Sequence, residues 1–292
     1  MDPAHKSISL VLGGGGARGY AHVGVIRALE EHGFAVHSIA GCSMGALVGG
    51  IYAAGKLADY EIWARKIDRR QIFSLMDISF GGGGLLKGER VIGALRELVG
   101  ELRIEDLPIS FTAVATDLIR EREVWIDKGP LFDAIRASIS LPLFFTPVDH
   151  LGVRLVDGGI FDPVPIAVTY RDRTDLTVAV SLSGPPSART RDAPLSDKVE
   201  EANGSSARLW KLFPGRTEKG ERPDDAPWDL SFVASRSLDV MQGVITRQRL
   251  ASNPPDVLIE IPRDACGILE FDRASELIAL GYEMARARLE TL

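Results

Sequence analysis

Residues 7–45, SISLVLGGGGARGYAHVGVIRALEEHGFAVHSIAGCSMG, carry the clearest signal for the fold of this chain. Residues 7–12 are an apolar run of strand length that ends in glycines, and residues 18–32 carry apolar side chains at helical spacing. A second apolar run over 34–40 leads into another glycine-rich turn and a helical pattern that ends near residue 54. The order strand, helix, strand, helix predicts an α/β fold.

The remainder of the chain continues this alternation. Further strands are expected over residues 109–116, 123–126, 153–156, 176–181 and 257–261, and further helices over 89–98, 130–138, 232–250 and 273–289. The pattern predicts a mostly parallel central sheet flanked by helices. A length of 292 residues is compatible with one α/β domain, so we expect a single domain over residues 1–292.

The composition is that of a globular protein, with 45% hydrophobic and 25% charged residues. A formal net charge of −6 argues against nucleic acid as the main partner. Cys42 and Cys266 have a spacing that indicates neither a disulfide framework nor a zinc site. No apolar stretch is long enough for a signal peptide or a membrane span. We therefore expect a cytoplasmic protein, and if its substrate is membrane lipid, it must reach that lipid from the side, at the inner surface of the membrane.

Residues 184–229 form a long polar stretch, which we interpret as an insertion or lid. One apolar patch interrupts it, at Leu209, Trp210, Leu212 and Phe213. Tryptophan and phenylalanine beside a lysine suit the headgroup boundary of a lipid surface. The patch is therefore a candidate for peripheral membrane contact, and the alternatives are a lid over a pocket or a segment that packs back on the core.

The first glycine loop has a rival interpretation. Gly14, Gly16 and Gly19 spell G-x-G-x-x-G between a strand and a helix, which is the context of a dinucleotide-binding motif. That motif also needs an acidic residue about 20 positions further on, at the end of the second strand. Residues 40–43 contain no carboxylate, so the dinucleotide interpretation is disfavoured.

Four consecutive glycines, residues 13–16, allow backbone amides to approach a ligand without obstruction by a Cβ atom. The helix that follows directs its positive end to the same place, so the loop is suited to an anion or a transient oxyanion. Arg18 adds either a charge that faces the site or a surface cation, and we favour the first.

Residues 41–45 spell Gly-Cys-Ser-Met-Gly, a G-x-S-x-G motif between an expected strand and an expected helix. At a nucleophile elbow the central serine occupies a strained turn, and small neighbours are needed to avoid clashes. Ser43 is the candidate nucleophile. Cys42 is an alternative, but it is off-centre in the turn.

A serine hydroxyl needs a base, and two are possible. The order of residues in the chain allows a triad of Ser43, Asp117 and His150, but His150 is expected in a surface turn. Asp157 instead follows an apolar strand and precedes two glycines, and desolvation there could raise its pKa enough to act as a base. We expect His22 to be a packed helix residue.

Three motifs in this order, GGGGARG at 13–19, GCSMG at 41–45 and DGG at 157–159, resemble the patatin-like phospholipase family. The stretches at 27–33, 115–118, 137–148 and 238–251 are similar to bacterial members of this family and to the related catalytic domain of neuropathy target esterase. The resemblance covers about residues 7–183 and 231–290, and leaves the polar stretch after them unaligned.

The resemblance implies a Ser-Asp dyad, carried onto Ser43 and Asp157, and an oxyanion hole, carried onto Gly14, Gly15, Gly16 and Arg18. It also implies phospholipase A or lysophospholipase activity through an acyl-serine intermediate, with lipid or acyl-ester substrates and no metal or cofactor. The alternative from another class is a regulatory protein that binds an acyl chain or a partner on the same fold with little turnover.

Overall fold

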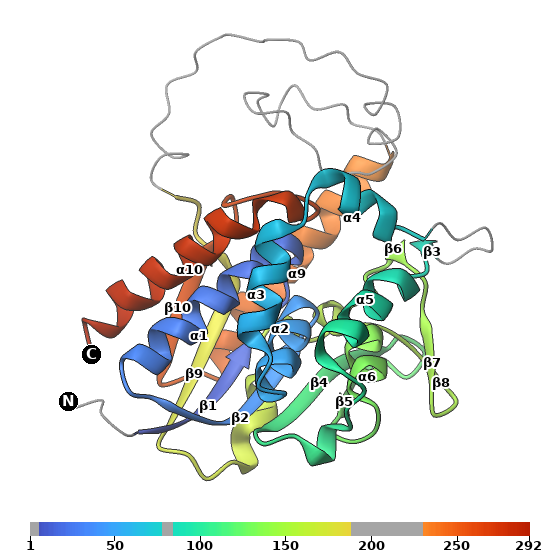
Figure 1. Ribbon diagram of the computed structural model, residues 1–292. Coiled ribbons are helices and arrows are strands. Elements are labelled where there is room, and N and C mark those ends of the chain that lie inside the picture. Colours follow the sequence, from blue (N-terminus) through green and yellow to red (C-terminus); the bar gives the residue numbers. More distant parts are fainter. Residues whose placement is uncertain (1–5, 78–83, 188–229) are drawn as a thin grey trace, which may run out of the picture.

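The computed structural model describes residues 6–77, 84–187 and 230–292. A central sheet of eight strands lies at the middle of the fold (Figure 1). Its strands are β1 (Ser7–Leu12), β2 (Ala35–Cys42), β4 (Ser110–Asp117), β5 (Arg122–Ile126), β7 (Val148–His150), β8 (Val153–Asp157), β9 (Leu176–Gly184) and β10 (Val257–Pro262). The order is β10-β9-β1-β2-β4-β8-β7, and β5 pairs with β4. The run from β10 to β4 is parallel, whereas β5, β7 and β8 pair antiparallel. The predicted α/β fold with a mostly parallel sheet is confirmed.

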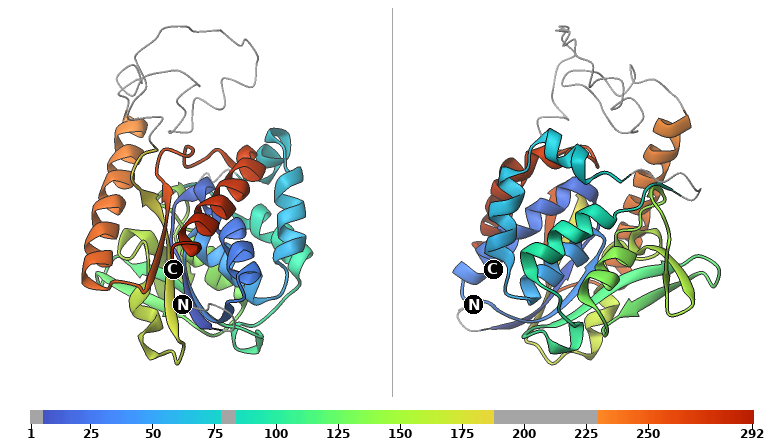
Figure 2. Two further views of the ribbon diagram at one scale, coloured as in Figure 1. Left: turned by 90° about the vertical axis from the view of Figure 1, so that its left-hand side faces the viewer. Right: turned by 45° about the vertical axis from the view of Figure 1, so that its right-hand side comes forward.

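Helices cover both faces of this sheet. In Figure 2, α1 (Ala21–Glu31) and α10 (Ala274–Leu289) lie on one face, and α9 (Leu230–Ser252) lies on the other. The short 3-10 helix η1 (Gly16–Tyr20) leads directly into α1, and α2 (Met44–Ala53) follows β2. The connection after β1 leads to β2 on one side, and the connection after β9 leads to β10 on the other, so a switch point, where α/β sheets bind ligands, lies between β1 and β9.

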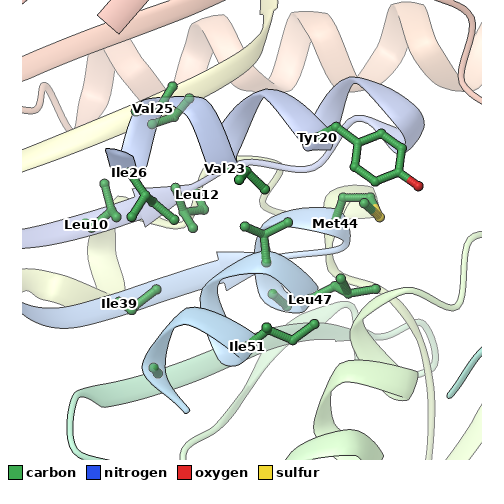
Figure 3. Close-up of a cluster of buried hydrophobic side chains, with 14 of the residues drawn as sticks. Leu10, Leu12, Tyr20, Val23, Val25, Ile26, Ile39, Met44, Leu47 and Ile51 are labelled. Carbon is green, nitrogen blue, oxygen red and sulfur yellow. The ribbon is translucent and has the colours of Figure 1, made fainter. Parts of the chain in front are cut away.

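The larger part of the core lies under α1, α2 and α10. Successive residues of a strand face opposite sides, so Leu10 and Leu12 of β1 join this large cluster whereas Val11 joins a smaller one on the other face. Figure 3 shows Leu10 and Leu12 beside Ile26 of α1. The small cluster beneath α9 consists of Val11, Ala40, Val164, Ile166 and Ala179.

Several elements were not predicted. They are α3 (Leu57–Lys66), α4 (Arg69–Leu75), the two-stranded sheet of β3 (Gly84–Leu86) and β6 (Leu143–Phe145), strand β7, and the 3-10 helices η2 (Ile104–Asp106), η3 (Gly158–Ile160), η4 (Ile166–Arg171) and η5 (Phe271–Arg273). The expected helices α5 (Glu89–Val99) and α6 (Leu131–Ser138) are present. The sequence did carry a signal for α4, because Asp68 and Gln71 form a capping box at its start.

His150 was expected in a surface turn, and it lies one residue before that turn. His150 ends β7 and pairs with Val153 of β8 in a hairpin. The turn itself is formed by Leu151 and Gly152, with φ angles of 49° and 78°. Positive φ at both positions is typical of the two-residue turns that match the twist of a hairpin.

Strand β9 includes Gly184, so the expected polar insertion begins after it. Residues 188–229 lie outside the described residues, and with them the apolar patch at Leu209, Trp210, Leu212 and Phe213. Among the residues that the structure describes, no helix is both long and apolar enough to cross a bilayer.

Candidate active site

Ser43 occupies a strained turn between β2 and α2. Its φ and ψ angles are 53° and −123°, a conformation that a residue with a side chain rarely adopts. A Cβ atom on Gly41 would come within 2.6 Å of the backbone of Ala46, and one on Gly45 would come within 1.9 Å of the carbonyl oxygen of Leu12. Both glycines of the G-x-S-x-G motif are therefore required by close backbone approach, as expected of a nucleophile elbow.

A buried serine that the sequence reasoning did not single out fixes this turn. The backbone amide of Ser43 donates to Oγ of Ser138 at 2.9 Å, and that hydroxyl donates to the carbonyl of Val114 at 2.6 Å. Ser138 thus connects the elbow to the centre of β4. No local sequence signal identifies it, because its partners are 95 and 24 residues away in the chain.

Asp157 lies directly beside Ser43. It ends β8, which pairs antiparallel with β4 and places Asp157 opposite Ala115. Oγ of Ser43 donates to Oδ2 of Asp157 at 2.6 Å, and the amide of Gly159 donates to Oδ1 at 2.8 Å. Asp157 is 1% exposed, and its burial raises the pKa of the carboxyl to about 6, although both hydrogen bonds oppose the rise.

Cys42 lies under the same carboxyl. Its Sγ atom is 3.9 Å from Oδ1 of Asp157, and a Cβ atom on Gly14 or Gly158 would crowd that sulfur. Burial, and secondarily the charge of Asp157, raise the pKa of the Cys42 thiol well above its usual value. The thiol is therefore protonated and is a poor nucleophile.

The glycine loop after β1 faces Ser43. Gly13 donates its amide to Val180 at 3.0 Å, and Gly14 donates to Pro163 at 2.9 Å. The next two amides, those of Gly15 and Gly16, have no acceptor among the described residues. Gly14 instead provides space, because a Cβ atom there would lie 3.3 Å from Cβ of Ser43. The loop thus presents two available backbone donors beside the serine.

Arg18 is buried, with 2% of its side chain exposed, and lines the same cavity. Its guanidinium donates to the carbonyl of Gly15 at 3.1 Å, to the carbonyl of Arg263 at 3.0 Å and to Asp239 at 2.9 Å. These three bonds occupy each nitrogen of the group. Arg18 is therefore not a surface cation, and its hydrogen bonds are made to the protein around the loop.

The remaining candidate residues, His22, Asp117 and His150, make their contacts away from Ser43. Nε2 of His22 lies 2.8 Å from the carbonyl of Gly13, and burial lowers the pKa of the imidazole to about 4. Asp117 bonds the amides of Ile119 and Arg120 at the end of β4. No hydrogen bond joins Asp117 or His150 to Ser43 among the described residues, so the structure does not assemble the alternative triad.

An apolar cavity of about 150 Å³ opens from Ser43 and Asp157. Apolar side chains from several helices line it, among them Leu47, Tyr60, Trp63, Ile67, Ile72, Leu75, Met76, Val91, Leu95, Ile139, Phe144, Phe145, Ile268 and Phe271. Four of these, Tyr60, Trp63, Ile72 and Leu75, belong to α3 and α4, which the sequence reasoning missed. Besides Gln242 and the polar atoms on the rings of Tyr20, Tyr60 and Trp63, the polar groups that line the cavity belong to the glycine loop, Arg18, the elbow and Asp157, which form its polar end.

Three comparisons relate this chain to known proteins. A model of the family described as "Patatin-like phospholipase" matches residues 10–170, which include the glycine loop, Ser43 and Asp157. A protein named "Uncharacterized NTE family protein" from Mycobacterium tuberculosis is 40% identical, over 97% of this chain and 91% of its own. A crystal structure of VipD from Legionella pneumophila superposes with a TM-score of 0.46 and 16% identity, over 99% of this chain and 67% of that chain.

A more distant relative has a more specific name. A protein named "Lysophospholipase NTE1" from Pyricularia oryzae is 29% identical, and the match spans 98% of this chain but 19% of the fungal protein. The family model alone covers more than half of the 292 residues. The chain belongs to the patatin-like phospholipase family.

Proposed function

We propose that this protein is a serine acyl-ester hydrolase that acts on phospholipids or lysophospholipids through a dyad of Ser43 and Asp157. The observation that carries the proposal is the 2.6 Å hydrogen bond from Oγ of Ser43 to Oδ2 of Asp157 at the polar end of an apolar cavity. An acyl chain fits the apolar side chains, and its ester carbonyl would then lie at the serine. The family, and the name of the fungal relative, support a lipid substrate.

The first half of the reaction forms an acyl-serine. With a pKa of about 6, the Asp157 carboxyl is mostly ionised at neutral pH and is basic enough to accept the proton of Ser43 as Oγ attacks the ester carbon. The amides of Gly15 and Gly16 are the donors for the oxyanion that forms. When the tetrahedral intermediate collapses, the bond to the alcohol breaks, and Asp157 returns the proton to the departing oxygen.

The second half regenerates the enzyme. Water attacks the acyl-serine carbon and gives its proton to Asp157, the oxyanion forms again at the same amides, and the fatty acid leaves as Oγ of Ser43 recovers the proton. Ser43 also immediately precedes α2, so the positive end of that helix favours negative charge near the elbow. Removal of one oxyanion donor typically costs about 3–4 kcal/mol in the barrier.

Two substitutions test the dyad. Ser43→Ala and Asp157→Asn should each abolish most hydrolysis of a lysophospholipid and of a soluble p-nitrophenyl ester, because the nucleophile and its base act as a unit. Circular dichroism should show both variants folded, and a fluorophosphonate should label the native protein but not the alanine variant. A native protein that binds fatty acid but neither turns over ester nor reacts with the fluorophosphonate would instead be an acyl-chain binding protein.

We also propose that the patch at Leu209, Trp210, Leu212 and Phe213 contacts the lipid surface, on the basis of its composition alone. Replacing Trp210 and Phe213 with serine should then weaken hydrolysis of vesicle lipid much more than hydrolysis of a soluble short-chain ester. An equal loss on both substrates would point to a lid or a core segment.

A further inference from the structure

Helix α9 touches both loops of the site although it shares little apolar contact with the rest of the protein. It lies opposite α1 and α10 across the sheet (Figure 2). Of its described side chains, Leu250 packs on the small apolar cluster, while Val233, Val240, Met241 and Val244 are exposed. Polar contacts therefore contribute to the position of the helix, and two of these reach the catalytic loops.

The first contact is an ion pair with the glycine loop. Oδ1 of Asp239 lies 2.9 Å from Nη2 of Arg18, and its Oδ2 accepts a hydrogen bond of 2.9 Å from Arg236. The exposed fractions are 2% for the Arg18 side chain and 15% for that of Asp239. Since a buried guanidinium without a counter-charge is strongly unfavourable, Asp239 stabilises Arg18 in the orientation that the structure shows.

That orientation determines where one oxyanion donor points. Nε of Arg18 holds the carbonyl of Gly15, and this carbonyl shares a planar peptide unit with the amide of Gly16. No peptide bond in the described residues is cis, so the Gly16 N–H points opposite to the Gly15 carbonyl, away from the guanidinium. Gly16 and Ser43 line the same cavity. Asp239 thus acts on the Gly16 donor through Arg18.

The second contact reaches the segment after Asp157. Nη2 of Arg249 donates to the carbonyl of Phe161 at 3.2 Å and to Glu123 of β5 at 2.5 Å, and its Nε is 3.9 Å from Oδ1 of buried Asp162. The carbonyl of Pro163, the next residue, accepts the amide of Gly14. Arg249 therefore restrains the segment that joins the Asp157 turn to the glycine loop.

We propose that Asp239 and Arg249 are positioning residues for acyl transfer, and that α9 holds the oxyanion loop and the Asp157 turn in register with each other. The proposal rests on the proposed hydrolase function. Since neither side chain is placed to touch the scissile ester, their loss should lower kcat and leave KM nearly unchanged. A displacement of about 1 Å at a catalytic group can cost about 100-fold in rate, so we expect a 10- to 100-fold fall in kcat.

The first test uses the shape-matched variant Asp239→Asn, which removes the charge that balances Arg18. On a soluble p-nitrophenyl ester its kcat should fall at least tenfold with KM within twofold of native, and fluorophosphonate labelling should slow by a similar factor. Asp239→Glu should recover most of the rate. Arg247→Gln on the same helix is the control, because the exposed Arg247 makes no hydrogen bond or ion pair with a described residue, and it should leave kcat within twofold.

A double-mutant cycle separates positioning from general weakening. If Asp239 acts through Arg18, the pair Arg18→Ala and Asp239→Ala should lose no more activity than Arg18→Ala alone. Additive losses would mean that the two residues act separately and would overturn this half of the proposal. A fall in kcat matched by an equal fall in the folded fraction would overturn it as well.

Arg249→Gln tests the other end of the helix. It should lower kcat about tenfold with KM unchanged, and native kcat in this variant would remove Arg249 from the proposal. Failure of the hydrolase function itself would look different from either of these results. The native protein would then show no turnover, or Ser43→Ala would keep full activity. The positioning role of α9 would be wrong if Asp239→Asn and Arg249→Gln both had native kcat while the native protein was active and Ser43→Ala was inactive.

Discussion

The two faces of the central sheet are stabilised in different ways. On the face of α1, α2 and α10, a large continuous cluster of buried aliphatic and aromatic side chains joins helices to strands. On the face of α9, the cluster has five buried residues, with short side chains such as Ala40 and Ala179 among them. The helix there is attached by directional contacts from Asp239 and Arg249.

The two faces should therefore contribute to different properties, one mainly to stability and the other mainly to the geometry of the proposed catalytic site. Apolar burial contributes free energy roughly in proportion to the area removed from water and has no preferred direction. Hydrogen-bonded ion pairs contribute less net free energy but fix the orientation of the groups they join. We therefore expect substitutions on the first face to act mainly on the free energy of unfolding, and substitutions on the second to act mainly on turnover.

Substitution of a matched pair of buried isoleucines, one on each face, should change stability most. Ile26 of α1 is 0% exposed in the large cluster, and Ile166 of η4 is 2% exposed in the small one. Ile26→Ala should lower the free energy of unfolding by about 4 kcal/mol. Ile166→Ala should lower it by only about 2 kcal/mol, because Ile166 has fewer apolar neighbours to lose. Urea denaturation measures both. Equal losses would show that the two faces contribute alike.

The second prediction concerns pH and the carboxyl of Asp157. Its pKa of about 6 means that the basic form is lost as the pH falls, so kcat should drop about tenfold per unit below pH 6. Initial rates on a soluble ester between pH 4.5 and 8 would show this. A profile that stays flat down to pH 5 would contradict the assignment of Asp157 as the base.

The third prediction concerns stability on the α9 face. Burial, and then the charge of Glu123, raise the pKa of Asp162 to about 7, so the folded state binds its proton more strongly than the unfolded chain does. The free energy of unfolding should therefore fall as the pH rises from about 4 to 7, as the raised pKa of Asp157 also requires. Asp162→Asn should weaken this dependence and add about 1–2 kcal/mol at pH 8. A destabilised variant at pH 8 would show that the attraction of Arg249 outweighs burial.

Substitutions at the edge strand of the sheet should have little effect on either stability or turnover. His150 lies on β7, the terminal strand, and bonds neither Ser43 nor Asp157 among the described residues. His150→Ala should change kcat by less than twofold and the melting temperature by a few degrees at most. A large loss of activity would revive the histidine-based triad.

Much of the fold could be predicted because its signals are local. The apolar run of β1, the helical spacing of α1 and the glycines around Ser43 each occupy a few consecutive residues. Helices α3 and α4 were not predicted. For α4 a local signal was present, because Asp68 and Gln71 have the spacing of a capping box. With those helices the lining of the cavity was missed too.

The candidate site was harder to predict because its contacts are long-range. Ser43 and Asp157 are 114 residues apart, and the family resemblance, not their spacing, brought them together. Which glycine amides remain available depends on acceptors at Val180 and Pro163, far along the chain. The role of Asp239 follows only from the direction of the Arg18 guanidinium, which no residue pattern encodes.

The sulfur of Cys42 has a consequence for redox chemistry. Oxidants and alkylating reagents attack the thiolate, and the buried thiol beside Asp157 is held in its protonated form. The thiol next to the proposed nucleophile is therefore unreactive, although an adduct on it would block access to Ser43. Hydrolysis should accordingly be independent of added reductant and persist in the presence of mild peroxide, so the proposed enzyme needs no reducing environment in order to act.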